Sequence, residues 1–131
     1  MANRADQVAK FARRYEAAWN SGDATQVAAC YAENGGIIIN RGEPWQGRAG
    51  VAAMATGFYA DVNRMRVILD DLRIAGSHVA FIWTFTGQHA GTGQPLNVKG
   101  WEEWDLDADG LILASKGWFD AEDYARQVAG T

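Results

Sequence analysis

The sequence contains few side chains that form disulfide bonds or bind metal ions. Cys30 is the one cysteine among 131 residues, so no disulfide can form within the chain. Histidine is nearly as rare, with only His78 and His89. Zinc sites use sets of Cys and His ligands at close, regular spacing, and that spacing is missing here. We therefore expect neither a metal ion nor another cofactor.

Long apolar runs and clusters of basic residues are also missing. No run approaches the roughly 20 apolar residues that span a bilayer, and residues 1–10 are too polar for a signal peptide. The 12 Lys and Arg against 16 Asp and Glu give a formal net charge of −4. The basic residues are scattered, whereas binding to a phosphate backbone requires a basic stripe. These absences predict a cytoplasmic protein that binds neither nucleic acid nor a membrane.

Helical periodicity marks the first half of the chain, whose length fits one domain over residues 1–131. The apolar spacing predicts an amphipathic helix over about residues 5–20, ended by Gly22. Asp23 begins a second helix with Gln26 as its capping-box partner, and Tyr31 lies on its buried face. A strand at residues 37–39 precedes a third helix, whose apolar positions are Val51, Met54, Ala55 and Phe58.

Alternation with a period of two marks the second half. The first strand, from about residue 64 to 74, changes its apolar parity midway, so we expect a β-bulge near Asp70 and Asp71. Three more strands cover about residues 79–85, 96–107 and 111–119. Asp120 caps a final helix through the backbone N–H of Asp123. Helices segregated from an antiparallel meander indicate an α+β fold.

The strand at residues 96–107 carries the strongest functional signal. Glu102 shares its face with Val98 and Trp104, which places a carboxyl group on the apolar side. Such a group must be paired, protonated or placed on a wet cavity, because burying an ionised carboxylate alone is costly. A pocket role, with a raised pKa and proton chemistry, and a structural role at the sheet rim both stay open.

Other candidates are weaker. Tyr15 and Trp19 lie one helical turn apart on the face turned to the sheet, where their polar atoms need partners. Core packing is the alternative for both. Asp120 is a reserve acid or base beside its capping role. His89 is either a loop residue or directed to the mouth of a cavity, and Cys30 is expected to be a small buried apolar residue.

Several segments resemble a known superfamily. Tyr15-Glu-Ala-Ala-Trp19-Asn-Ser-Gly22-Asp23 and Pro44-Trp45-Gln46-Gly47 resemble the opening of nuclear transport factor 2-like proteins, and Trp118-Phe119-Asp120 resembles their close. The resemblance covers nearly the whole chain and implies a cone-shaped, curved antiparallel sheet wrapped around N-terminal helices. The superfamily contains SnoaL-like polyketide cyclases and ketosteroid isomerase, together with non-enzymatic domains.

The resemblance also implies roles for individual residues. Tyr15 matches the oxyanion-hole Tyr of ketosteroid isomerase, and Glu102 matches the position of its protonated Asp. The general-base Asp of that enzyme falls on Ile39 or Asn40, neither of which removes a proton. Ketosteroid isomerase activity itself is therefore not implied.

The expected function is a cofactor-independent isomerase, cyclase or dehydratase that acts on a small apolar or aromatic molecule. Glu102 would be the acid or base, and Tyr15 would donate a hydrogen bond to a carbonyl or enolate oxygen. The alternative is a non-catalytic ligand-binding or dimerisation domain. The pocket is expected between the first helix and the sheet, lined by Tyr15, Glu102, Trp19, Phe58, Trp83 and Trp104.

Surplus apolar surface predicts a homodimer through the outer face of the sheet. If one face lines the cone, the other exposes Trp101, Ile112 and Trp118 together. Soluble monomers rarely leave such a patch uncovered, and two-fold pairing covers it.

Overall fold

Apart from a two-residue strand at Trp45–Gln46, the helices and strands follow one another in the predicted order. The computed structural model describes residues 3–131, so Met1 and Ala2 of the expected domain lie outside the described residues. The helices are α1 (Arg4–Asn20), α2 (Ala24–Ala28), α3 (Gly47–Asp61) and α4 (Ala121–Ala129). The strands are β1 (Tyr31–Ile39), β2 (Trp45–Gln46), β3 (Val62–Ala75), β4 (His78–His89), β5 (Pro95–Leu106) and β6 (Ile112–Phe119). None of the helices described over residues 3–131 is long and apolar enough to cross a membrane.

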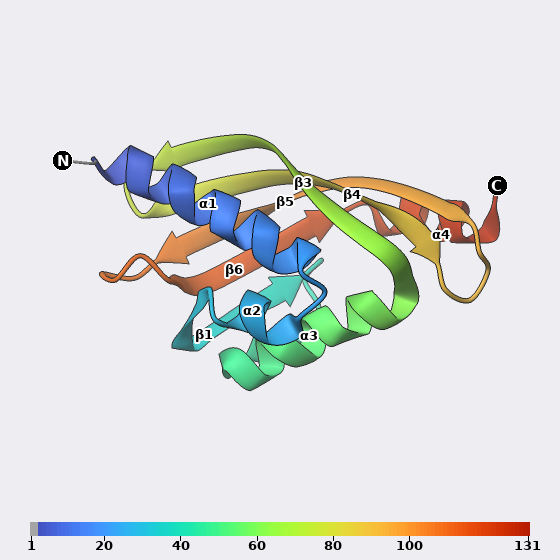
Figure 1. Ribbon diagram of the computed structural model, residues 1–131, viewed down its shortest axis with the longest axis horizontal. Coiled ribbons are helices and arrows are strands. Elements are labelled where there is room, and N and C mark those ends of the chain that lie inside the picture. The colour runs from blue at the N-terminus through green and yellow to red at the C-terminus, as the bar shows by residue number, and fades with distance from the viewer. Residues whose placement is uncertain (1–2) are drawn as a thin grey trace.

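One curved sheet of six strands, ordered β2-β1-β6-β5-β4-β3, carries the fold. Strands β3 to β6 form the predicted antiparallel meander. The early strand β1 adds to it in parallel, beside β6, and β2 pairs with β1 in a segment without a strand signal. Figure 1 shows α1 crossing one face of the curved sheet, while α2 and α3 lie near β1. The α+β fold with N-terminal helices on a curved sheet is confirmed.

The bulge predicted in β3 is present at Asp70. Before it, Leu69 lies opposite Trp83; after it, Leu72 lies opposite Phe81, so Asp70 is the extra residue. Since Trp83 and Phe81 share one face of β4, the bulge keeps both halves of β3 facing the core. The Thr84 hydroxyl donates to the Asp70 carboxylate at 2.5 Å and holds the bulged residue on the outside.

An irregularity in the pairing of β5 with β6 overturns part of the predicted outer face. The register of β5 and β6 shifts beside Leu106, and both Leu113 and Ala114 are exposed. Ile112, which the sequence pattern places on the outer face, is therefore fully buried, and Leu113 is exposed in its place. Both alternating sets of this strand contain apolar residues, so its pattern could not reveal the shift.

The helix ends agree with the predicted signals except at α2. Gly22 follows α1 with a φ of +73°, as a glycine at this position commonly does. The Asp23 side chain caps α2 through the N–H of Thr25, but its own N–H bonds to Ser21 Oγ rather than to Gln26. Tyr31 belongs to β1 and not to the buried face of the second helix.

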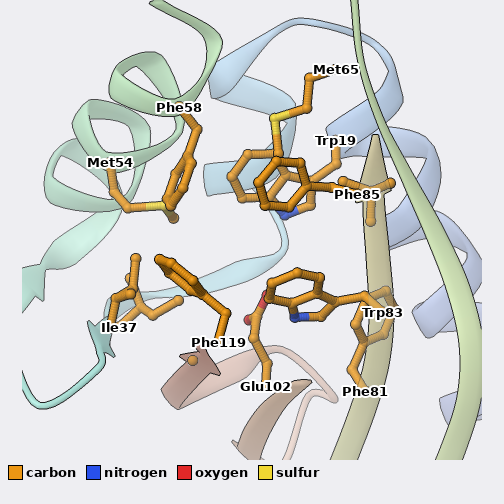
Figure 2. Close-up of a pocket in the computed structure, with 13 residues that line it drawn as sticks. Trp19, Ile37, Met54, Phe58, Met65, Phe81, Trp83, Phe85, Glu102 and Phe119 are labelled. Carbon is orange, nitrogen blue, oxygen red and sulfur yellow. The ribbon is translucent and has the colours of Figure 1, made fainter. Parts of the chain in front are cut away.

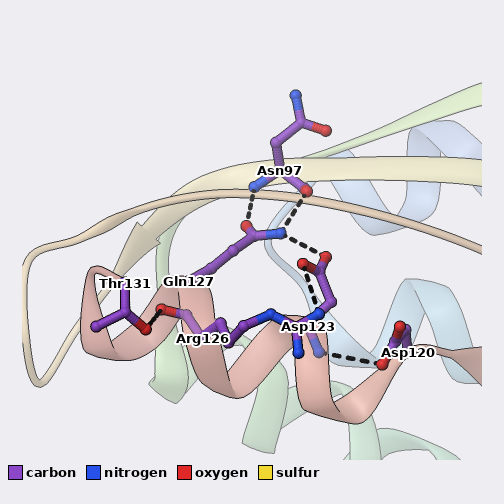
Figure 3. Close-up of polar contacts among 6 residues, drawn as sticks. All are labelled: Asn97, Asp120, Asp123, Arg126, Gln127 and Thr131. Atoms are coloured by element: carbon purple, nitrogen blue, oxygen red, sulfur yellow. Dashed lines mark hydrogen bonds and ion pairs between the residues drawn. The ribbon is translucent and has the colours of Figure 1, made fainter.

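The last helix, α4, is fastened to the free edge of β5 (Figure 3). Because β6 ends opposite Gly100, the backbone of Asn97 has no strand partner on that side. The Gln127 side chain takes that place, accepting from Asn97 N at 2.8 Å and donating to Asn97 O at 2.9 Å. Asp120 caps the helix as predicted, accepting from Asp123 N at 3.0 Å.

Candidate functional site

The Glu102 carboxyl group lies at the centre of a buried hydrogen-bond cluster. The strict alternation of β5 turns Glu102 inward, where 6% of its surface is exposed. Tyr15, from α1, donates to Oε1 at 3.0 Å and to Oε2 at 3.1 Å. Trp104 Nε1 donates to Oε1 at 3.0 Å and Ser115 Oγ at 2.8 Å, from β5 and β6. Tyr31, from β1, adds a longer contact to Oε1 at 3.4 Å.

The two carboxyl oxygens of Glu102 differ in their surroundings. Oε1 accepts from four side chains, whereas Oε2 accepts from Tyr15 alone. A carboxylate oxygen has about two lone-pair sites, so the acceptor capacity of Oε1 is filled. Oε2 is therefore the oxygen with capacity left to accept a further hydrogen bond.

Burial controls the protonation of this cluster. Removal from water raises the pKa of Glu102, and the hydrogen bonds from Trp104, Ser115, Tyr15 and Tyr31 lower it by less than burial raises it. Burial raises the pKa values of Tyr15 and Tyr31 well above 10, with a further increase from the nearby Glu102 charge. Both hydroxyls therefore stay protonated, and Glu102 is the member of this cluster whose pKa burial raises from an ordinary acidic value.

An apolar cavity of about 50 Å³ lies against Glu102 (Figure 2). Figure 2 shows side chains from α1, α3 and the strands converging on it. The volume is well below the roughly 300 Å³ at which sites for drug-sized ligands begin, and it exceeds the space that one water needs. The lining residues are Trp19, Ile37, Ile39, Met54, Phe58, Met65, Val67, Phe81, Trp83, Phe85, Glu102, Gly117 and Phe119.

Two glycines shape this cavity. A Cβ on Gly100 would lie 2.6 Å from the Trp83 ring and 2.3 Å from Trp118 O, so this glycine lets the indole lie flat on β5. A Cβ on Gly117 would meet Glu102 Cγ at 3.8 Å, an ordinary contact. The missing side chain of Gly117 thus leaves open space directly beside the carboxyl-bearing side chain.

The sequence of the chain matches a known protein family. The family model described as the SnoaL-like domain matches residues 12–115, which is most of the chain. The chain belongs to the SnoaL-like domain family. A search of the curated proteins finds no match.

Solved structures share the fold of this SnoaL-like domain at low sequence identity. A protein with a ketosteroid isomerase-like fold from Catenulispora acidiphila, in complex with trimethylamine, is 16% identical with a TM-score of 0.85, covering 92% of each chain. A putative SnoaL-like polyketide cyclase from Jannaschia sp. is 17% identical with a TM-score of 0.81, covering 95% of this chain and 93% of that one. TsrD from Streptomyces laurentii is 22% identical with a TM-score of 0.84, covering 100% of both.

The SnoaL-like domain brings together most, but not all, of the residues expected at its pocket. Glu102 lines the cavity together with Trp19, Phe58 and Trp83. Tyr15 and Trp104 lie behind the carboxyl group, where they donate to it, and neither lines the cavity. Within residues 3–131 there is no group of three His, Cys, Asp or Glu side chains that could hold a metal ion.

Residues expected at the margin of the pocket lie apart from it. Asp120 is exposed and serves its capping role, and it is not among the lining residues. His89 lies at the end of β4, where its ring nitrogen accepts from the N–H of Thr92. Cys30 is buried, as expected, and burial raises the pKa of its thiol.

Two members of the Glu102 cluster could not be recognised from the sequence. The helical pattern places Tyr31 on a helix face, although it begins β1 and its hydroxyl lies 3.0 Å from that of Tyr15. Ser115 follows the irregularity of β6, so its face could not be predicted. Both alternating sets of β6 contain apolar residues, so the pattern of this strand holds no signal that identifies Ser115.

Proposed function

We propose that residues 1–131 form one SnoaL-like domain that catalyses proton transfer on a small molecule, as a cofactor-independent isomerase, cyclase or dehydratase. The observation that carries this proposal is a single titratable side chain, Glu102, among the lining residues of an otherwise apolar cavity. A buried carboxyl group with a raised pKa is a candidate for general acid–base catalysis.

The geometry suggests how Glu102 would act. In its protonated form, Oε2 can donate a hydrogen bond or a proton to a substrate oxygen, since the other carboxyl oxygen already has its full set of donors. In its ionised form, the same oxygen can remove a proton from carbon. As no second titratable group lines the cavity within residues 3–131, the proton that Glu102 removes would also be the one it returns.

Tyr15 acts through Glu102 in this proposal. Its hydroxyl donates to both carboxyl oxygens, and its side chain does not line the cavity. It is therefore a positioning residue that fixes the carboxyl plane, instead of a direct donor to a substrate oxygen as the resemblance implied.

A non-catalytic ligand-binding domain is the second candidate. Aromatic side chains dominate the lining, and the cavity is small, which suits tight enclosure of a compact ligand as well as catalysis. The Catenulispora protein in complex with trimethylamine shows one relative of this fold with a small molecule. The Jannaschia protein, described as a putative SnoaL-like polyketide cyclase, supports the catalytic alternative.

The protonation of Glu102 tests the catalytic proposal directly. Carboxyl chemical shifts followed by NMR from pH 3 to 9 should give Glu102 a pKa above the ordinary value of about 4.3. Glu103, the next residue on β5, faces outward, so the variant Glu103→Gln is a matched control that should leave this titration unchanged. A Glu102 pKa at or below the ordinary value would remove the acid–base assignment.

A further inference from the structure

The cavity beside Glu102 has an unusual combination of charge and surface. Its only charged lining side chain, among residues 3–131, is an acid. Six of its lining residues are aromatic: Trp19, Phe58, Phe81, Trp83, Phe85 and Phe119. A ligand with a negative charge would meet like charge in a poorly hydrated space, which is costly. While Glu102 is ionised, the favoured ligand is therefore neutral or positively charged.

A compact cation can interact with both the aromatic rings and the carboxyl group that line the cavity. The faces of Trp, Tyr and Phe rings attract ammonium groups, with Trp the strongest, and enclosure by several rings is how proteins bind methylated ammonium ions. Two indoles, Trp19 and Trp83, line this cavity together with the Glu102 carboxyl group (Figure 2). Burying a cation is expensive unless an anion accompanies it, and the Glu102 carboxylate supplies one.

The number of free hydrogen-bonding groups restricts the cation further. Glu102 Oε2 accepts only from Tyr15, so it has room for one further donor. A primary ammonium has three N–H donors, of which two would stay unpaired against apolar side chains. A tertiary ammonium has one N–H donor, and its alkyl groups match the remaining surface. With about 50 Å³ of space, those alkyl groups must be as small as methyl.

We propose that this cavity binds a small tertiary methylammonium ion, which donates its single N–H to Glu102 Oε2 and packs its methyl groups against the aromatic rings. The inference rests on the proposed small-molecule site, but it does not require catalysis. Its failure and the failure of the proposed proton transfer can therefore be told apart.

Binding should be linked to the ionisation of Glu102. The titratable groups that contact this carboxyl are the Tyr15 and Tyr31 hydroxyls, and the Cys30 thiol is near enough to be affected by its charge. Burial raises the pKa values of all three, so they stay neutral while Glu102 titrates. The bound cation favours the carboxylate, so affinity should increase as the pH rises through the pKa of Glu102 and then level off.

Calorimetric titration with trimethylammonium chloride tests the proposal, with tert-butanol as a neutral probe that also carries three methyl groups and one hydrogen-bond donor. Wild-type protein at pH 8 should bind trimethylammonium at least about tenfold more tightly than tert-butanol, since hydrogen bonds to ionised groups are the stronger ones. Glu102→Gln should weaken trimethylammonium binding about tenfold or more and leave tert-butanol binding unchanged. Glu103→Gln, on the outer face of the same strand, should change neither.

Three results would overturn the proposal: no trimethylammonium binding, equal affinity for the two probes, or equal cation affinity in the wild-type protein and the Glu102→Gln variant. Should Glu102→Gln fail to fold, the wild-type comparison of the two probes and its pH dependence still decide the question. Cation binding together with an ordinary Glu102 pKa in the free protein would support this inference while removing the proposed catalysis.

Discussion

The burial of Glu102 disfavours the ionised form of its carboxyl group. Four neighbouring side chains donate hydrogen bonds to the carboxyl group, which favours the ionised form, yet burial still raises its pKa. A structural carboxylate with this many donors would have a lowered pKa if it lay near water. The burial of Glu102 beside an apolar cavity is thus the feature on which its proposed acid–base role depends.

The raised pKa of Glu102 predicts a pH-dependent stability. Folding favours the protonated form, so the contribution of Glu102 is fully present below its unfolded pKa of about 4.3. It is lost as the pH rises through the higher folded pKa, by about 1.4 kcal/mol for each pH unit between the two values. Urea unfolding from pH 4 to 8 should show the free energy of unfolding of wild-type protein falling relative to Glu102→Gln. A difference that stays constant over this range would contradict the raised pKa.

Gly117 offers a second test at the residue scale. A methyl group there would lie 3.6 Å from Ile39 Cγ1 and 3.8 Å from Glu102 Cγ, in ordinary contact, and would fill part of the cavity. Gly117→Ala should therefore change the free energy of unfolding by less than about 1 kcal/mol while it weakens binding of trimethylammonium about tenfold.

Gly100→Ala is the contrasting variant for that test. Its Cβ would lie 2.3 Å from the backbone oxygen of Trp118, so β5 and β6 must separate, and a loss of about 1–3 kcal/mol is expected. Thermal unfolding of both variants separates the two effects. If Gly117→Ala destabilises the protein as much as Gly100→Ala does, the space beside Glu102 is not open.

At the scale of elements, periodicity predicts the inward face of most strands. In β5 every second residue is buried, so the position of Glu102 follows directly from its neighbours Val98 and Trp104. In β3 the apolar residues change parity midway, which is enough to predict a bulge near Asp70 and Asp71, whereas the register shift between Asn63 and Arg66 is not predicted. Both inferences need only that one face be apolar and the other polar.

The same reasoning could not predict β6 or the pairing of β1. Both alternating sets of β6 contain apolar residues, so the pattern does not show that Ile112 points inward or that Ser115 reaches Glu102. Parallel pairing of β1 with β6 joins segments far apart in the chain, which no local signal specifies. The helical pattern misplaces Tyr31 for a related reason, since α2 ends after Ala28 and leaves Tyr31 to the strand.

At the scale of the whole molecule, the outer face of the sheet retains an apolar patch. Trp101 lies opposite Trp118, and their rings stack with centroids 6.3 Å apart. Trp101 is 43% exposed and Leu113 is 41% exposed on the same face. Arg41 lies over the Trp118 ring, at 5.7 Å from its centroid. Among the described residues, the buried Trp118 Nε1 has no hydrogen-bond partner, which is unusual for a buried indole. The outer face therefore contains a hydrogen-bond donor that the described chain does not pair.

We expect this patch to be the centre of a two-fold homodimer. An isologous pairing would cover Trp101 and Leu113 of both copies at once and close on itself. Light scattering at micromolar concentration should give twice the 14.3 kDa mass of one chain. Trp101→Glu places a charge at the expected centre and should shift the mass to that of the monomer.

Trp45 provides the matched control for this prediction. It is 41% exposed, almost as much as Trp101, but it lies on β2 at the edge of the sheet. Trp45→Glu adds the same charge to an equally exposed indole and should leave the dimer intact. A wild-type monomer would contradict the prediction outright, and a dimer that survives Trp101→Glu but dissociates with Trp45→Glu would move the interface to the β2 edge. Dissociation by Trp101→Glu alone would place the interface on the back of the sheet, on the opposite face of β5 from Glu102.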